Sequence, residues 1–143
     1  MTDAIVQSVV VEASREKLFS LLVEPDELVR WWPDLAELEP RPGGRIHLVM
    51  PTGSVVVGHV NRFEPPAALG FTWTWPDRPG HDLQVDFTVD DLGGGRSRVT
   101  VTHSGWSGLD ELRRRHDSGW AHFLACLRDL AEGRPVDKSF DPS

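Results

Sequence analysis

Residues 108–133 read GLDELRRRHDSGWAHFLACLRDLAEG, and this stretch decides the fold. Its apolar and aromatic residues recur every three or four positions, which is the spacing of one face of an α-helix. The recurring positions are Leu109, Leu112, His116, Trp120, Phe123, Leu127 and Leu130. At about 1.5 Å per residue, a helix over 108–132 would span roughly 37 Å and could cross a whole sheet. Ser107 and Asp110 predict a capping box at its start, and Gly133 with Pro135 predicts its end.

The residues before this helix alternate with a period of two, as in strands with one buried face. Residues 69–75, LGFTWTW, place large apolar side chains between glycine and threonine, and residues 82–91 and 96–104 repeat the alternation. Strands are expected at 4–12, 45–50, 54–64, 68–75, 82–91 and 96–104. Turns are expected at 52–53, 76–80 and 93–95 because glycine and proline gather there.

Two short helices are expected after the first strand. Ser14 has the character of an N-cap, and an apolar stripe over 18–22 follows it. Pro25 ends this helix and suits the first turn of the next, whose face carries Leu28 and the pair Trp31 and Trp32. Residues 34–43 are rich in proline, glycine and acids and predict a loop.

These elements predict an α+β fold in which a curved antiparallel sheet of about six strands packs around the long C-terminal helix. Short turns between successive strands favour antiparallel pairing, and the apolar face of such a sheet needs a cover. Only the last helix is long enough to provide it. A single domain is expected over 1–135, followed by a loose tail over 136–143.

Composition restricts the function classes. The chain of 143 residues is 39% hydrophobic and 26% charged, so it can bury a core. A net charge of −7 disfavours binding to nucleic acid. No apolar run is long enough for a membrane span and no secretory signal is visible, so a cytoplasmic location is expected. The six histidines and the single Cys126 have no metal-ligand spacing, and no nucleophile elbow, phosphate loop or dinucleotide fingerprint occurs, so neither metal nor cofactor is predicted.

Six short motifs follow one another in an order that resembles one family. They are EAS-x-x-x-LF (12–19), P-x-x-L-x-x-WW (25–32), RPGGR (41–45), G-x-V-x-x-F-x-PP-x-x-L-x-FTW (58–73), VTVTHSG (99–105) and GW (119–120). Together they resemble the START-like (SRPBCC) superfamily, in the branch of homologues of the activator of the heat-shock-protein ATPase.

The resemblance implies a helix-grip fold with a hydrophobic cavity between the sheet and the last helix. Members of the superfamily include lipid, hormone and polyketide binders, and cyclases or aromatases that act on polyketides. The activity that gives the branch its name is that of a co-chaperone, which usually carries a further domain. The glycine at 119 would then allow a close approach of the helix to the sheet, although an incidental glycine near a kink is the alternative.

The candidate ligand-binding residues share the faces that should enclose this cavity. They are Trp73, Trp75, Phe87, Val101, His103, His116, Trp120 and Phe123. Each large ring could instead simply fill the core. His103 continues the apolar face behind Val99 and Val101, and His116 lies one helical turn before Trp120. Either histidine could bond a ligand or act as acid and base, or be a satisfied histidine near the cavity mouth.

Three functions remain open at this point. The first is a protein that binds a hydrophobic, ring-containing small molecule of lipid or polyketide type, without catalysis. The second is a cyclase or aromatase-type enzyme that uses His103 and His116. The third is a co-chaperone-like interaction module or homodimer, in which a sheet edge or the surface at Trp31 and Trp32 meets a protein partner. The residues favour the first, because the inward faces carry no carboxylate and the chain has no tyrosine.

Overall fold

The structure is a computed structural model that describes residues 3–140. The described residues form seven strands and three helices: two short helices follow the first strand, and the long helix follows the last. Their order is β1 (Ile5–Val11), α1 (Arg15–Val23), α2 (Pro25–Leu28), β2 (Leu35–Leu38), β3 (Arg45–Val49), β4 (Val55–Glu64), β5 (Ala68–Trp75), β6 (Arg78–Gly93), β7 (Arg96–Ser104) and α3 (Asp110–Ala131). No helix within residues 3–140 combines the length and the apolar content that a membrane crossing requires.

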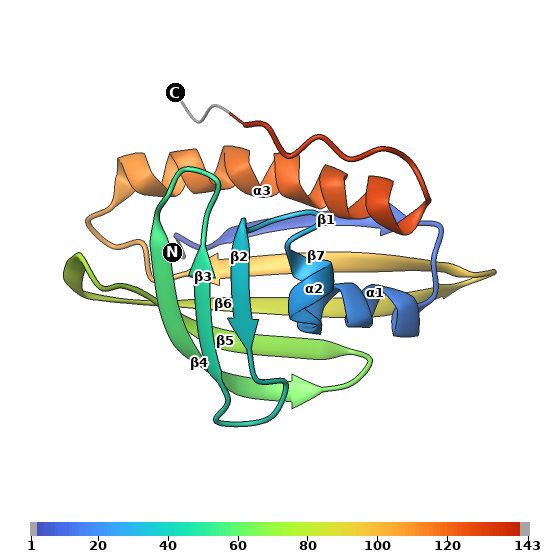
Figure 1. Cartoon of the computed structure of the whole chain (residues 1–143), viewed down its shortest axis with the longest axis horizontal. Helices are drawn as coiled ribbons and strands as arrows, with labels where there is room; N and C mark the ends of the chain where they lie inside the picture. Colours follow the sequence, from blue (N-terminus) through green and yellow to red (C-terminus); the bar gives the residue numbers. More distant parts are fainter. Residues whose placement is uncertain (1–2, 141–143) are drawn as a thin grey trace.

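All strands belong to one antiparallel sheet with the order β1-β7-β6-β5-β4-β3-β2. Figure 1 shows α3 running alongside β1, while β2, β3 and β4 turn across the other strands and the β3–β4 hairpin reaches up to α3. Trp120 of α3 lies over the sheet, with its ring 5.6 Å from Phe87 of β6. The expected α+β helix-grip fold is therefore confirmed, with seven strands where about six were predicted.

The buried face of the sheet is a set of side-chain rows that cross the strands. One row pairs Val60 with Phe71, Phe71 with Val85, Val85 with His103, and His103 with Ile5. All five are buried. Alternation along each strand places this row on one face, as the sequence pattern predicts, and the histidine thus lies deep in an otherwise apolar layer.

Hydrogen bonds hold α3 against the N-terminal part of the chain. The amide of Gln7 in β1 donates to the Asp117 carbonyl at 2.6 Å and to its carboxylate at 2.7 Å. At the C-terminal end of the helix, the Lys17 ammonium donates to the Ala131 carbonyl at 2.7 Å. A basic group near the last carbonyls of a helix also suits the helix dipole. The helix is therefore held within its first half, at Asp117, and at its C-terminal end.

The short helices follow the prediction closely. Ser14 caps α1, because its hydroxyl accepts a hydrogen bond from the Lys17 amide at 3.2 Å. Leu28, Trp31 and Trp32 are all buried, and the Trp31 indole donates to the Leu21 carbonyl at 2.9 Å. The two indoles after α2 thus face inward. They do not form the exposed patch that an interaction module at this position would need.

Three local predictions were wrong. Residues 35–38, predicted as loop, form the edge strand β2, which main-chain pairing with β3 stabilises although only Leu38 is buried. The turn predicted over 76–80 occupies two residues only, and β6 already begins at Arg78. The predicted capping box is absent: Leu109 is the N-cap of α3 and has no side-chain cap bond. Gly108, with φ of 78°, separates Ser107 from the helix.

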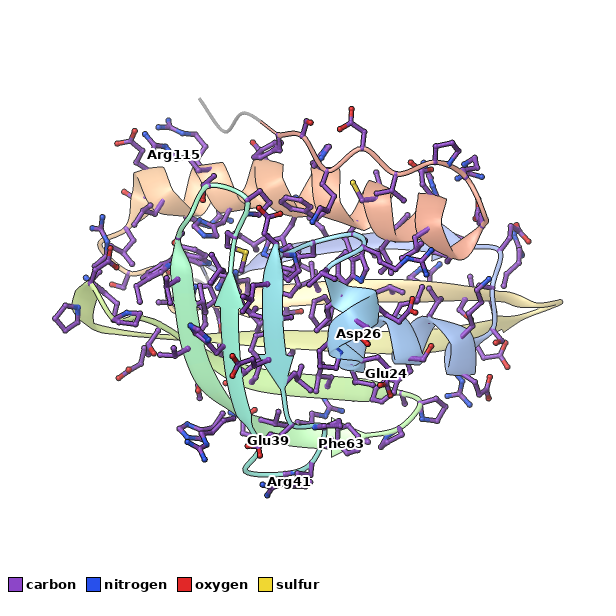
Figure 2. All side chains as sticks on the ribbon, viewed as in Figure 1. Glu24, Asp26, Glu39, Arg41, Phe63 and Arg115 are labelled. Carbon is purple, nitrogen blue, oxygen red and sulfur yellow. The ribbon has the colours of Figure 1, made fainter. Side chains whose placement is uncertain are left out.

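Charged side chains lie on the outside of this body, as Figure 2 shows for Glu39 and Arg41 beside the chain reversal before β3. These two form an ion pair at 3.2 Å. The C-terminal segment, predicted to be loose over 136–143, runs back over the body as far as residue 140. There the Lys138 ammonium donates to the carbonyls of Val29 at 2.8 Å and Pro33 at 3.0 Å. Residues 141–143 lie outside the described part.

Candidate functional site

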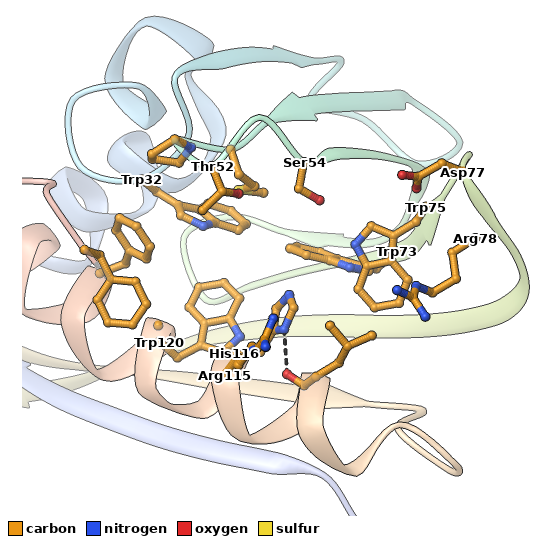
Figure 3. A pocket seen from close by; sticks show the side chains of 16 residues that line it. Trp32, Thr52, Ser54, Trp73, Trp75, Asp77, Arg78, Arg115, His116 and Trp120 are labelled. Carbon is orange, nitrogen blue, oxygen red and sulfur yellow. Dashed lines mark hydrogen bonds between the residues drawn. The ribbon is translucent and has the colours of Figure 1, made fainter. Parts of the chain in front are cut away.

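A half-open cavity of about 310 Å³ lies between α3, the tip of the β3–β4 hairpin and the end of β5. It is shown in Figure 3. Six lining residues come from α3, and the rest come from four other places in the chain. The lining comprises Leu112, Arg115, His116, Gly119, Trp120 and Phe123 of α3, Met50, Pro51, Thr52 and Ser54 of the hairpin, Trp73, Trp75, Asp77 and Arg78, and finally Trp32 and Phe140.

Indole rings form the inner wall of this cavity. Trp32 lies 4.9 Å from Trp120 and 6.0 Å from Trp73, measured between ring centroids, and it is nearly parallel to Trp73 with an interplanar angle of 16°. Trp75 meets Trp73 edge-on at 6.4 Å. Such offset and edge-on contacts are the favoured arrangements of aromatic pairs. The rings therefore support one another and together form an aromatic wall of the cavity.

The structure places five of the eight predicted ligand-binding residues on this wall: Trp73, Trp75, His116, Trp120 and Phe123. The other three, Phe87, Val101 and His103, lie behind the wall in the core. They share the correct face of the sheet, but larger side chains on the neighbouring strand and on α3 stand between them and the cavity.

His103 is completely buried, with an exposed fraction of 0%. Its Nδ1 accepts a hydrogen bond from the Trp120 indole at 3.0 Å. An indole nitrogen can only donate, so Nδ1 carries no proton and the proton of the neutral ring is on Nε2. This Nε2–H has no partner among the described residues. Burial, and then the nearby His116, holds the pKa of His103 well below its ordinary value of 6.5.

His116 reaches the cavity from α3. Its Nδ1 lies 2.8 Å from the Leu112 carbonyl, one turn earlier in the same helix. Burial lowers the pKa of His116 from 6.5, against a smaller opposing effect of that hydrogen bond. The ring packs against Trp106 at 4.8 Å and Trp75 at 5.8 Å. His116 is therefore a neutral imidazole at pH 7, with one edge fixed by its own helix and the other toward the cavity (Figure 3).

The mouth of the cavity carries polar side chains that the sequence did not mark as site residues. Thr52 and Ser54 lie on the hairpin, and Asp77 and Arg78 lie at the turn from β5 to β6. Arg115 also borders the mouth, where it forms an ion pair with Glu111 at 3.0 Å. That i,i+4 pair agrees with the helix-face spacing in the sequence. The exposed charges surround an entrance whose interior is apolar.

Three further wall residues were not among the predicted ligand-binding residues. Trp32 precedes a proline at a helix end, where its direction could not be assigned. Phe140 comes from the C-terminal segment and stacks on His122 at 5.2 Å. Gly119, expected to permit close packing on the sheet, faces elsewhere: a methyl group at this position would meet only Phe140, at 3.7 Å. That expectation was wrong.

A second hollow, of about 830 Å³, lies on the opposite face of the sheet. Thr72 and Thr74 border it, and they alternate with the tryptophans of β5 that face the first cavity. Most of its other lining is charged or imidazole, including Glu37 and His47, which lie 3.8 Å apart. Within residues 3–140 no group of three metal-ligating side chains occurs. The aromatic cavity is therefore the better candidate for a ligand site.

The family model described as "Activator of Hsp90 ATPase homolog 1-like protein" matches residues 12–132. No curated protein sequence matches the chain. Among solved structures, protein MLL2253 from Mesorhizobium loti has 22% identity and a TM-score of 0.83, with 93% of this chain and 99% of that chain covered.

Two further structures show the same fold. CalU16 from Micromonospora echinospora has 21% identity and a TM-score of 0.76, with 94% of this chain and 78% of that chain covered. The Aha1 dimer from Colwellia psychrerythraea has 22% identity and a TM-score of 0.78, with 90% and 96% covered. The match of the family model over most of the chain decides the assignment: the protein belongs to the family of Activator of Hsp90 ATPase homolog 1-like proteins.

Proposed function

We propose that the chain binds a hydrophobic, ring-containing small molecule in the cavity between α3 and the sheet. One observation carries the proposal: four indoles from three separate parts of the chain line a single cavity together with two phenylalanines. A cavity with apolar aromatic walls and a few polar groups at its mouth is the usual form of a small-molecule site. Flat rings can stack on these walls without disturbing the core behind them.

The cavity volume suggests a ligand of modest size. Ligand pockets commonly measure about 300–1,000 Å³, so 310 Å³ lies at the small end. A molecule of two or three fused or linked rings suits this space better than a sterol or a long-chain lipid. A polyketide-like or other aromatic small molecule therefore fits the proposal best.

The alternative functions receive less support. A cyclase or aromatase-type enzyme would use His103 and His116, but His103 lies behind the wall, so His116 alone could touch a substrate. A co-chaperone-like module centred on Trp31 and Trp32 would need these side chains at the surface, and both are buried. The cytoplasmic location stays a prediction. A homodimer also stays a prediction, which light scattering on the purified protein would test.

Fluorescence of the neutral probe N-phenyl-1-naphthylamine tests the proposal. Its emission rises in an apolar site, and the cavity tryptophans should transfer excitation energy to it. We expect saturable binding to the wild type with one site per chain. Gly119→Leu should abolish binding because the leucine side chain would extend from the wall into the cavity. The matched control Gly119→Ala should still bind the probe. No saturable binding to the folded wild type, or equal binding to both variants, would contradict a ligand site here.

A further inference from the structure

We propose that the ligand carries a hydroxyl group that donates a hydrogen bond to Nε2 of His116. This inference rests on the proposed function and adds the polar chemistry that the cavity would recognise. It depends on the tautomer of His116, on the unpartnered N–H of Trp73 beside it, and on the lack of a protein group that already donates to Nε2.

The tautomer of His116 follows from its helix. A backbone carbonyl can only accept, so the nitrogen 2.8 Å from the Leu112 oxygen must carry the proton. In a neutral ring Nε2 then holds a lone pair and can only accept a hydrogen bond. No described residue donates to it. Because the residue lines the cavity, this lone pair is the acceptor that the inner wall presents to a ligand.

Two N–H groups beside His116 lack an acceptor. They are Nε1 of Trp73 and Nε2 of His103, both buried and without a partner among the described residues. The Trp73 ring centroid lies 6.0 Å from that of His116 and 4.7 Å from that of His103, and the two imidazoles are 5.8 Å apart. An unpartnered buried donor costs about 1–3 kcal/mol. Because Trp73 lines the cavity whereas His103 lies behind its wall, the Trp73 N–H is the dipole that favours an oxygen atom in this corner of the cavity.

A hydroxyl is the group that meets both requirements. It donates its proton to an acceptor such as Nε2 of His116, and its oxygen can accept from the neighbouring N–H of Trp73. An ether or ketone oxygen can only accept, so it would leave Nε2 without a donor. An amine would bring a donor but less acceptor capacity to the unpartnered indole. The geometry thus points to a phenol or enol on a small ring system.

Three naphthalenes of nearly equal shape separate these possibilities: 2-naphthol, 2-methoxynaphthalene and naphthalene. Their affinities would be measured by isothermal titration calorimetry. We expect 2-naphthol to bind about fivefold more tightly than the other two, the ratio that one neutral hydrogen bond gives. Equal affinity of 2-naphthol and 2-methoxynaphthalene would overturn the inference. The site would then recognise the ligand oxygen only as an acceptor and would not use the hydroxyl proton.

Variants assign the effect to His116. His116→Phe keeps a ring between Trp75 and Trp106 but removes the acceptor, so the affinity ratio of 2-naphthol to naphthalene should fall to about one, even if the new ring changes both affinities. His59→Gln is the matched control, since His59 is exposed on the opposite face. A preference that survives in His116→Phe would overturn the assignment.

Nitrogen NMR of the wild type gives an answer that does not depend on a variant. The Nε2 resonance of His116 should have the position of an unprotonated imidazole nitrogen and should shift when 2-naphthol is added, but not when naphthalene is added. An unchanged resonance would also overturn the inference. If naphthalene and 2-naphthol bind with equal affinity, only this inference is contradicted. If none of the three compounds binds, the proposed function is contradicted as well.

Discussion

Replacing Gly119 with alanine should stabilise the protein. Gly119 lies well inside α3 (Asp110–Ala131), and its φ is not in the positive range that would require glycine. The new methyl group would meet one side-chain atom, Cε2 of Phe140, at 3.7 Å. That distance is an ordinary van der Waals contact, so neither the backbone nor the sheet has to move.

The magnitude follows from helix propensity. Glycine in a helix interior is about 0.8–1.0 kcal/mol less favourable than alanine, chiefly because the unfolded glycine has more backbone freedom to lose. Since nothing near Gly119 opposes the methyl, most of this should appear as added stability. For a chain of this size, a gain of about 1 kcal/mol raises the melting temperature by roughly 3 °C.

Urea denaturation followed by circular dichroism at 222 nm would measure the change in the free energy of unfolding. Ala121→Gly, two residues later on an exposed position of the same helix, is the reverse control and should lose about 1 kcal/mol. A loss of stability in Gly119→Ala, with the expected loss in the control, would refute the reasoning. It would mean that the helix approaches another part of the chain at Gly119 more closely than the structure shows.

Three further predictions concern stability. Burial holds the pKa of His103 and His116 below 6.5, so the unfolded chain takes up protons that the folded chain does not, and stability should fall as the pH drops below about 6.5. Each histidine contributes up to about 1.4 kcal/mol per pH unit. The difference in the free energy of unfolding between pH 7.5 and pH 5.5, measured from urea curves, should be smaller in His103→Phe than in the wild type. An equal difference in both proteins would contradict this. Lys138→Met should cost about 1–2 kcal/mol in thermal or urea unfolding, because two main-chain carbonyls lose their charged donor; an unchanged midpoint would show that the segment adds no stability. Ser97→Ala should cost about 1–2 kcal/mol, since the buried Ser97 hydroxyl donates to the Ala13 carbonyl at 2.9 Å; Ser104→Ala, on a less buried site of the same strand, is the control and should change little.

The parts of the fold that were predictable are those in which local periodicity and burial agree. The stripe through α3 and the alternation in β5, β6 and β7 each reflect one buried face, so their positions and faces could be assigned from the sequence. The edge strand β2 could not, because its four residues, LAEL, are too few to show an alternation, and its pairing with β3 depends on main-chain bonds. The start of α3 was misplaced because Gly108 separates Ser107 from the helix.

The site shows the same division. Periodicity identified which side chains face inward, and five of the eight candidates line the cavity. It could not identify which inward residues form the surface layer and which lie behind it, as His103 does behind Trp73. Which residues reach the cavity depends on how far the side chains of neighbouring strands extend from the sheet. Trp32 and Phe140 reach the cavity from distant parts of the chain, and no spacing in the sequence relates them.

By itself, the sequence determined the layers of this protein: a sheet with one apolar face, a long helix to cover it, and the large rings on both. These properties depend on the residue type and on distances of a few positions along one element. The tertiary structure alone decided the cavity, the partners of the two histidines and the unpartnered donors beside them. Each of these depends on how α3, the β3–β4 hairpin and the C-terminal segment meet. His116 illustrates the division, since its place on the inward stripe of α3 was visible from the sequence, whereas the tautomer that its hydrogen bond to the Leu112 carbonyl selects was not.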